Sequence, residues 1–257
     1  MGGFEPTALS SKLKSRDLRL APVGGFAEND GMFQVGSIIF RFRGAFGIPV
    51  EIGQTLAFLV LLLVGLSLSA GGDPLWLAIV LVMIFGLIYL HELGHAWACR
   101  VQGIAVRRIV LHGGGGFCEQ AQTATPYQQE FIVAMGPIVN LALWAITTLA
   151  TDWIWRNGLG SGYFTHFLSL FGWLNLMFFV FNMLPVLPLD GGRLLQLLLR
   201  RFLPRGTSMR VTGGIGLIVA ILWWPALIWL WVNGGFLLLF FPSIRLHYRM
   251  LRGEVQI

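Results

Sequence analysis

The sequence predicts an all-α polytopic membrane protein with about six transmembrane helices and short membrane-associated β-strands or hairpins near the cytoplasmic face. Three observations carry this prediction. Of the 257 residues, 56% are hydrophobic and 12% are charged, whereas a soluble domain carries about 25% charged residues. Several apolar stretches reach the roughly 20 residues that a helix needs to cross a bilayer. Basic residues gather on one side of these stretches.

The apolar stretches define the expected spans along the chain. We place five of them at 55–70, 75–99, 130–151, 164–184 and 211–232. A short apolar run at 236–241 is expected to be part of a sixth span. Residues 185–202 hold a further apolar helix, which two prolines separate from the fourth span because proline interrupts a helix.

The basic residues set the expected orientation. If the N-terminus is cytoplasmic, the spans alternate and the last run returns the chain, 17 of the 18 lysine and arginine residues face the cytoplasm. Cytoplasmic loops carry such an excess of positive charge. We therefore expect a multi-pass integral membrane protein with a cytoplasmic N-terminus. Anionic lipid explains the net charge of +6, and the sequence offers no basic soluble domain for nucleic acid.

Three parts are expected along the chain: a flexible cytoplasmic N-terminal segment at 1–35, a membrane domain at 36–242 with its core at 75–203, and a basic cytoplasmic tail at 243–257. The first 50 residues are polar and rich in glycine, so no cleavable signal peptide is expected. Cys99 and Cys118 make no disulfide framework and are expected to be free thiols.

A polar cluster follows the uncharged residues 74–90 of the second span. His91-Glu92-Leu93-Gly94-His95 puts two imidazoles one helical turn apart with a carboxylate beside them. Zinc hydrolases use this arrangement. His91 lies about 24 Å along the span, inside a hydrocarbon core of about 30 Å but nearer its cytoplasmic side. Ionisable groups at such a depth mark functional sites; the alternative is polar contact between helices.

Asp190 is the expected third ligand, since a hydrolytic zinc ion needs three protein ligands and a position for water. Pro185 and Pro188 interrupt the helix after the fourth span. This span also runs toward the cytoplasm, so Asp190 is expected at a depth like that of His95. Unwound backbone at membrane depth needs protein or a water-filled cavity around it. The alternative for Asp190 is a cap on the helix that follows.

His112 is the competing candidate for the third ligand. It precedes the four glycines at 113–116, and the alternative is a loop histidine before a flexible turn. His166 and His247 are poorer candidates, because one lies at the outer end of the fourth span and the other in the basic tail.

These motifs resemble those of the site-2 protease family, the zinc metalloproteases that cleave inside membranes. The pentapeptide at 91–95 ends an apolar helix, as in that family. The segment Asn182-x-x-Pro185-x-x-Pro188-Leu189-Asp190-Gly191-Gly192 is close to the family's Asn-Pro-Asp-Gly signature. The segment Gly136-Pro137-x-x-Asn140 resembles the family's Gly-Pro-x-x-Asn motif. Asn175 matches a further position, and residues 40–50 resemble the strand-like entry to the first helix of smaller members.

The resemblance implies one zinc ion per chain, held by His91, His95 and Asp190, with Glu92 as the general base. It also implies an endopeptidase that acts within the lipid bilayer on a single-span transmembrane protein. The alternative is a proteolytically inactive membrane scaffold that binds zinc. Glu92 argues against the scaffold, because a pure binding site needs no base beside its ligand.

The asparagines have two possible roles each. Asn182 either donates a hydrogen bond to a substrate carbonyl or oxyanion or caps and braces the broken helix. Asn140 and Asn175 are expected to brace the packing of helices.

Two segments can capture a substrate as an added strand: Ser37 to Arg43, which alternates in polarity, and Ala105 to Leu111. The alternative for both is an ordinary interfacial hairpin. Relatives often carry a PDZ or a CBS domain. We expect neither here, because the connection from Arg100 to Thr125 is short and about 25 residues follow the fifth span, fewer than a domain needs.

Overall fold

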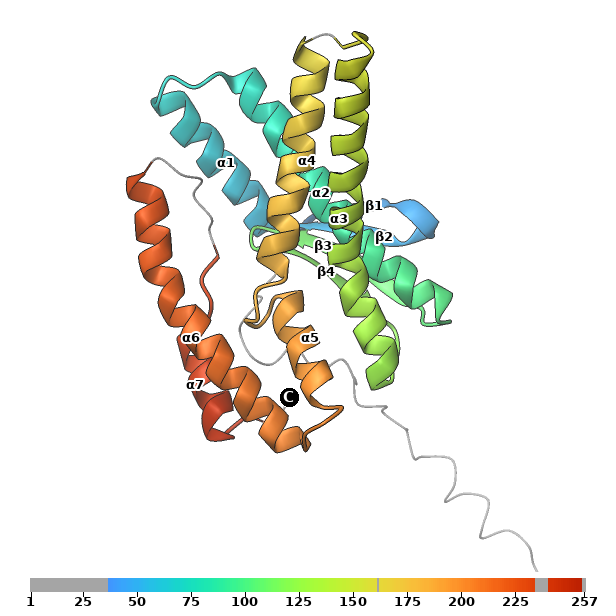
Figure 1. The fold of residues 1–257 in the computed structure, drawn as a ribbon, viewed down its shortest axis with the longest axis vertical. Coiled ribbons are helices and arrows are strands. Elements are labelled where there is room, and N and C mark those ends of the chain that lie inside the picture. The colour runs from blue at the N-terminus through green and yellow to red at the C-terminus, as the bar shows by residue number, and fades with distance from the viewer. Residues whose placement is uncertain (1–36, 161, 234–239, 256–257) are drawn as a thin grey trace, which may run out of the picture.

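A computed structural model describes residues 37–160, 162–233 and 240–255. It is mostly helical with one small sheet (Figure 1). In chain order the elements are β1 (Ile38–Arg43), a 3₁₀ turn (Ala45–Gly47), β2 (Pro49–Gly53), α1 (Gln54–Ser69), α2 (Pro74–Val101), β3 (Val106–His112), β4 (Gly115–Gln120), α3 (Pro126–Arg156), α4 (Gly162–Asn182), α5 (Asp190–Leu199), α6 (Arg205–Val232) and α7 (Ile244–Arg252).

Among the described residues, four helices are long and apolar enough to cross a membrane: α2, α3, α4 and the Arg205–Trp229 part of α6. These agree with four of the expected spans and support a multi-pass membrane protein. The expected count of about six is not confirmed. The first expected span corresponds to α1, whose 16 residues extend about 24 Å, less than the bilayer core of about 30 Å.

The predictions for the two ends of the chain can be compared with the structure only in part. The N-terminal segment at 1–35 and most of the run at 236–241 lie outside the described residues. Within the expected tail, residues Ile244–Arg252 form α7, which begins at the capping hydroxyl of Ser243 and ends at Gly253 with φ 74°. Figure 1 shows α7 alongside the lower part of α6.

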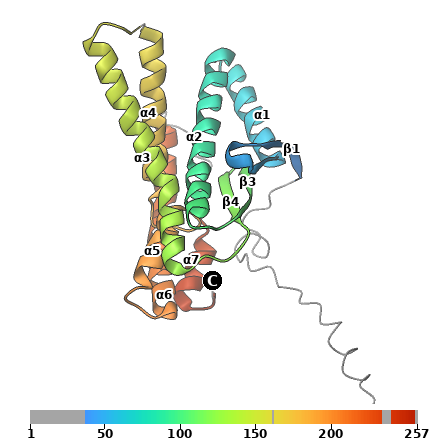
Figure 2. The same cartoon turned by 90° about the vertical axis from the view of Figure 1, so that its right-hand side faces the viewer.

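Local signals fix where α2 and α3 begin. Asp73 caps α2 by accepting a hydrogen bond from the Leu75 N–H, and Pro74 follows it, where a missing N–H costs nothing. Thr125 and Gln128 form a reciprocal capping box at the start of α3. Figure 2 shows α2 between the α3–α4 pair on one side and the sheet with α1 on the other.

The sheet has the order β1-β2-β3-β4, with β2 and β3 parallel and the outer pairs antiparallel. One charged side chain from each strand joins a ladder across it: Arg41 pairs with the buried Glu51, Glu51 with Arg108 at 2.7 Å, and Arg108 with Glu119 at 2.5 Å. The ladder favours this register, because a slip of β2 would separate the buried Glu51 carboxylate from both of its arginine partners.

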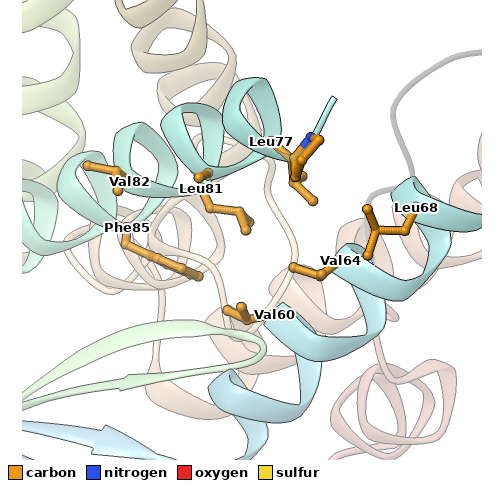
Figure 3. Close-up of a pocket in the computed structure, with 9 residues that line it drawn as sticks. Val60, Val64, Leu68, Leu77, Leu81, Val82 and Phe85 are labelled. Atoms are coloured by element: carbon orange, nitrogen blue, oxygen red, sulfur yellow. The ribbon is translucent and has the colours of Figure 1, made fainter. Parts of the chain in front are cut away.

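An apolar pocket of about 290 Å³, open on one side, lies between α1 and α2. Figure 3 shows Val60, Val64 and Leu68 of α1 facing Leu77, Leu81 and Phe85 of α2. The lining consists of apolar residues and includes none of the candidate site residues. The pocket therefore lies between the outer parts of the two helices, and its lining has no polar or charged side chain that could act in catalysis.

Candidate active site

The two histidines lie on one face of α2, one turn apart and buried, with exposed fractions of 3% for His91 and 8% for His95. Their Nε2 atoms are 3.1 Å apart. The helical spacing alone brings them together, since residues four apart stand above each other on a helix. A carboxylate oxygen of Glu92 lies within 4.8 Å of both imidazoles.

Asp190 reaches the same point from the far end of the chain. Its Oδ2 lies 3.0 Å from the His91 Nε2 and 3.2 Å from the His95 Nε2. The fourth span ends at Asn182, and α5 begins with Asp190 itself. The segment between them, which prolines interrupt, brings the carboxylate back to α2, so the structure places Asp190 beside the two imidazoles.

Each imidazole is oriented by the nitrogen that faces away from this point. The His95 Nδ1 lies 2.7 Å from the Ile132 carbonyl, which only accepts hydrogen bonds. The His91 Nδ1 lies 2.5 Å from the Asn140 Oδ1, and the Asn140 Nδ2 donates to the Asn175 Oδ1 at 2.9 Å. Both Nδ1 atoms therefore carry the proton, which leaves both Nε2 lone pairs free.

The three converging atoms fit a zinc ion. Tetrahedral ligands about 2.0–2.1 Å from zinc are about 3.3 Å apart, and the three distances between the ligand atoms, 3.0, 3.1 and 3.2 Å, are close to that value. Imidazole nitrogen with carboxylate oxygen is a common zinc donor set, and ligating histidines ordinarily donate their other N–H to a carbonyl or a similar acceptor. The two histidines and Asp190 would hold the ion, and the nearby Glu92 carboxylate would not be needed as a ligand.

Glycines allow the helices and the sheet to close around this point. A Cβ on Gly136 of α3 would lie 2.7 Å from the His91 Nε2 and would overlap the His95 ring. A Cβ on Gly94 would lie 2.7 Å from the Met135 carbonyl oxygen, and one on Gly116 of β4 would lie 2.7 Å from the Glu92 Cγ. Side chains at these three positions would push α3 or β4 away from the cluster.

The other sequence candidates have different surroundings. Asn182 is buried and donates through its Nδ2 to the Phe178 carbonyl of its own helix at 3.0 Å, a contact that suits the bracing alternative; its role toward a substrate stays a prediction. The Nδ1 of His112, at the end of β3, accepts from the Gly114 N–H at 3.1 Å, and burial lowers the pKa of this histidine. Gly115 and Gly116 belong to β4 rather than to the expected flexible turn.

Sequence reasoning underestimated Asn140. We expected it to brace the helices, whereas it contacts both His91 and Asn175. The signal that could have revealed this is the spacing of Gly136 and Asn140. Four residues on a helix place both on one face, so a glycine that makes room for the imidazoles predicts that the asparagine meets them.

The model of peptidase family M50 matches residues 79–158 and 154–223, which together make up more than half of the chain and include His91, Glu92, His95 and Asp190. The chain belongs to peptidase family M50.

Relatives of this M50 member include a zinc metalloprotease of Methanocaldococcus jannaschii, 28% identical over 178 residues that make up 68% of this chain and 50% of that protein. A Synechocystis protein is 33% identical over 190 residues, 70% of this chain and 46% of its own length. Stage IV sporulation protein FB of Bacillus subtilis is 32% identical over 120 residues, 46% of this chain and 39% of its own. The chain spans about half the length of the first two relatives.

A solved structure supports the fold of this M50 member. The site-2 protease from Methanocaldococcus jannaschii superposes with a TM-score of 0.58, covering 83% of this chain and 92% of the other at 23% identity. At this identity the likeness concerns the fold alone. It agrees with the family resemblance that the sequence motifs indicated.

Proposed function

We propose that this chain is a zinc-dependent intramembrane endopeptidase that cleaves transmembrane-helix substrates. The observation that carries the proposal is the convergence of the His91 and His95 Nε2 atoms with the Asp190 carboxylate at 3.0–3.2 Å. The two histidines lie on α2, which is apolar enough to cross a membrane, and Asp190 follows the break after the equally apolar α4. Such polar groups are costly at membrane depth. A hydrolytic site for buried peptide bonds accounts for them.

Glu92 is the general base of the proposed reaction. It is next to a ligand in the chain and buried, with 5% of the residue exposed. A zinc ion held at the site supplies Lewis-acid chemistry that polarises the scissile carbonyl and eases deprotonation of water. Glu92 takes the proton from the attacking water and then gives it to the leaving amine. Asn182 is the proposed donor to the substrate carbonyl. One hydrogen of its side-chain amide is bonded to the Phe178 carbonyl, and the second would donate to the substrate.

The proposed substrate is a single-span membrane protein that is unwound locally, because an intact helix hides its amides in internal hydrogen bonds. An added strand would hold the unwound segment. The expected capture segment at 105–111 cannot accept it, since β3 already pairs with β2 and β4. Of the edge strands β1 and β4, β4 is the better candidate because its Gly116 lies against Glu92.

The proposed orientation puts the N-terminus and the active site toward the cytoplasm. It rests on the distribution of lysine and arginine, which leaves Arg156 at the end of α3 as the single basic residue on the other side.

The test compares wild type with Glu92→Gln on a reporter transmembrane substrate in detergent or liposomes. Glutamine keeps the size of the side chain but cannot take a proton, so zinc content should remain near one per chain while chelator-sensitive cleavage disappears. Equal cleavage by the two proteins would refute the mechanism. Stoichiometric zinc without cleavage of any transmembrane peptide by wild type would favour the inactive scaffold.

A further inference from the structure

His247 is buried completely in the middle of α7, and both of its ring nitrogens have partners. The Nδ1 lies 2.8 Å from the Ser243 carbonyl oxygen one turn earlier. This oxygen only accepts, so Nδ1 carries the proton and Nε2 has a free lone pair. The Leu187 backbone N–H donates to that Nε2 at 3.1 Å. The imidazole therefore links the C-terminal helix to the segment between α4 and α5.

Glycines on α6 make room for this ring. A Cβ on Gly216 would lie 2.6 Å from the His247 Nε2 and would overlap the ring carbon beside it. A Cβ on Gly213, less than one turn away, would lie 2.6 Å from the Leu251 backbone nitrogen. Because both positions lack side chains, α7 lies directly against α6, and His247 reaches past α6 to Leu187.

The side chain of Leu187 is held by the same unit. Leu187 is 3% exposed and packs with Met209 of α6 and with Leu246 and Met250 of α7. The segment from Leu184 to Leu189 has lost the regular hydrogen bonds of α4, the last of which joins the Met183 N–H to the Phe179 carbonyl, so its buried N–H groups need other acceptors. His247 supplies one for Leu187.

Only two residues separate Leu187 from Asp190, and the turn between them is tight. The Leu189 N–H donates to the Val186 carbonyl at 3.0 Å. A Cβ on Gly192 would lie 2.7 Å from the Val186 carbonyl oxygen, so the first turn of α5 packs on the same segment. A shift of Leu187 is therefore passed on to the Asp190 carboxylate.

We propose that His247 is a positioning residue, which fixes Asp190 at the metal site by holding the Leu187 amide. The inference rests on the proposed function, because Asp190 is the proposed third ligand. The proposal gives α7 a role in the metal site although α7 is distant from the site residues in the sequence. Losing the acceptor should loosen the segment 183–190 and weaken metal retention while the α2–α3 contact stays intact.

The experiment uses the full chain with three substitutions. His247→Leu removes the acceptor, His247→Gln keeps an acceptor oxygen near the position of Nε2, and Tyr248→Leu changes the exposed neighbour on α7 as a control. Amide hydrogen exchange is measured on the metal-free proteins for peptides covering 183–190 and, for comparison, α2 and α3. Zinc loss to a chelator is then followed on the zinc-loaded proteins.

We expect His247→Leu to exchange faster at 183–190 alone and to lose zinc about tenfold faster, in the lower range for partners of metal ligands. His247→Gln and Tyr248→Leu should behave like wild type. If His247→Leu does not purify as a monodisperse protein, His247→Asn replaces it, since the shorter amide does not reach Leu187.

Three results would overturn the proposal: exchange and zinc loss unchanged in His247→Leu, faster exchange spread evenly over α2 and α3, or a glutamine variant as impaired as the leucine variant. Wild type that fails to retain zinc would instead contradict the proposed function. The exchange comparison, made without metal, would still decide the role of His247.

Discussion

The Asn140 side chain contacts the His91 imidazole across the α2–α3 interface, with Oδ1 2.5 Å from Nδ1. The bond determines which nitrogen of His91 carries the proton and turns Nε2 toward Asp190. Asn140 is itself held by Asn175 of α4 at 2.9 Å, and the Asn175 Nδ2 donates to the Phe171 carbonyl. Helices α3 and α4 thus orient the His91 imidazole through a chain of buried amides.

Replacing Asn140 by leucine should weaken zinc binding about 10- to 100-fold, because the His91 N–H would lose its acceptor and the ring its fixed orientation. Competition with a chelator measures the affinity. Asn140→Asp keeps an acceptor oxygen for the His91 N–H but loses the donor to Asn175, so its affinity should lie between those of wild type and the leucine variant. An Asn140→Leu protein with wild-type affinity would show that the hydrogen bond plays no part in metal binding.

Asp190→Ala should lower bound zinc well below one per chain, since it removes one of the three proposed ligands. Zinc content after dialysis, measured by atomic spectroscopy, checks this. Asp152→Ala removes an exposed carboxylate of α3 that pairs with Arg156 and should leave zinc unchanged. Undiminished zinc in Asp190→Ala would transfer the ligand role to another residue, with His112 the first to examine.

Gly136→Ala should disrupt the site although alanine favours helices. Its Cβ would fall 2.7 Å from the His91 Nε2 and overlap the His95 ring, so the rings must move. Gly86→Ala on α2 is the matched control, because nothing lies within 4 Å of its Cβ and the change should stabilise the helix by up to about 1 kcal/mol. Zinc content and thermal stability of both variants test this, and a Gly136→Ala protein with full zinc and activity would contradict the packing argument.

Stability should fall on mild acidification through His247. Burial lowers the pKa of this histidine in the folded protein, below the unfolded value of about 6.5. The unfolded chain therefore binds the proton more readily, and the stabilisation present above about pH 6.5 is lost as the pH falls toward the folded pKa. The midpoint of thermal unfolding, followed from about pH 7 to about pH 5, should drop more steeply for wild type than for His247→Gln. Equal slopes would contradict the prediction.

Sequence patterns within a short stretch of chain correctly predicted local features such as helical spacing, helix breaks and strands. The pairing of His91 with His95 follows from the helical repeat, and the break before Asp190 follows from Pro185 and Pro188. The strand at 37–43 follows from its alternation and becomes β1. These features depend on residues close in the chain, where covalent geometry leaves few conformations.

The same patterns could not predict which helices and strands lie next to each other in the folded protein. The segment 105–111 reads as an available strand, yet β3 lies inside the sheet between β2 and β4. The four glycines read as a flexible turn, yet Gly116 lies in a strand against Glu92. Strand order and close backbone approach depend on contacts between distant segments, on which a single stretch of sequence carries little information.

By itself the sequence determined a helical membrane protein, the pair His91 and His95 with Glu92 between them, and Asp190 as the expected third ligand. The tertiary structure alone decided that Asp190 arrives 3.0 Å from His91 across 99 residues of chain, that Asn140 contacts the His91 ring, and that His247 of α7 accepts a hydrogen bond from Leu187, three residues before Asp190. The physical reason is that helical spacing is set by hydrogen bonds four residues apart, whereas these contacts arise only when glycine-lined helix faces pack together.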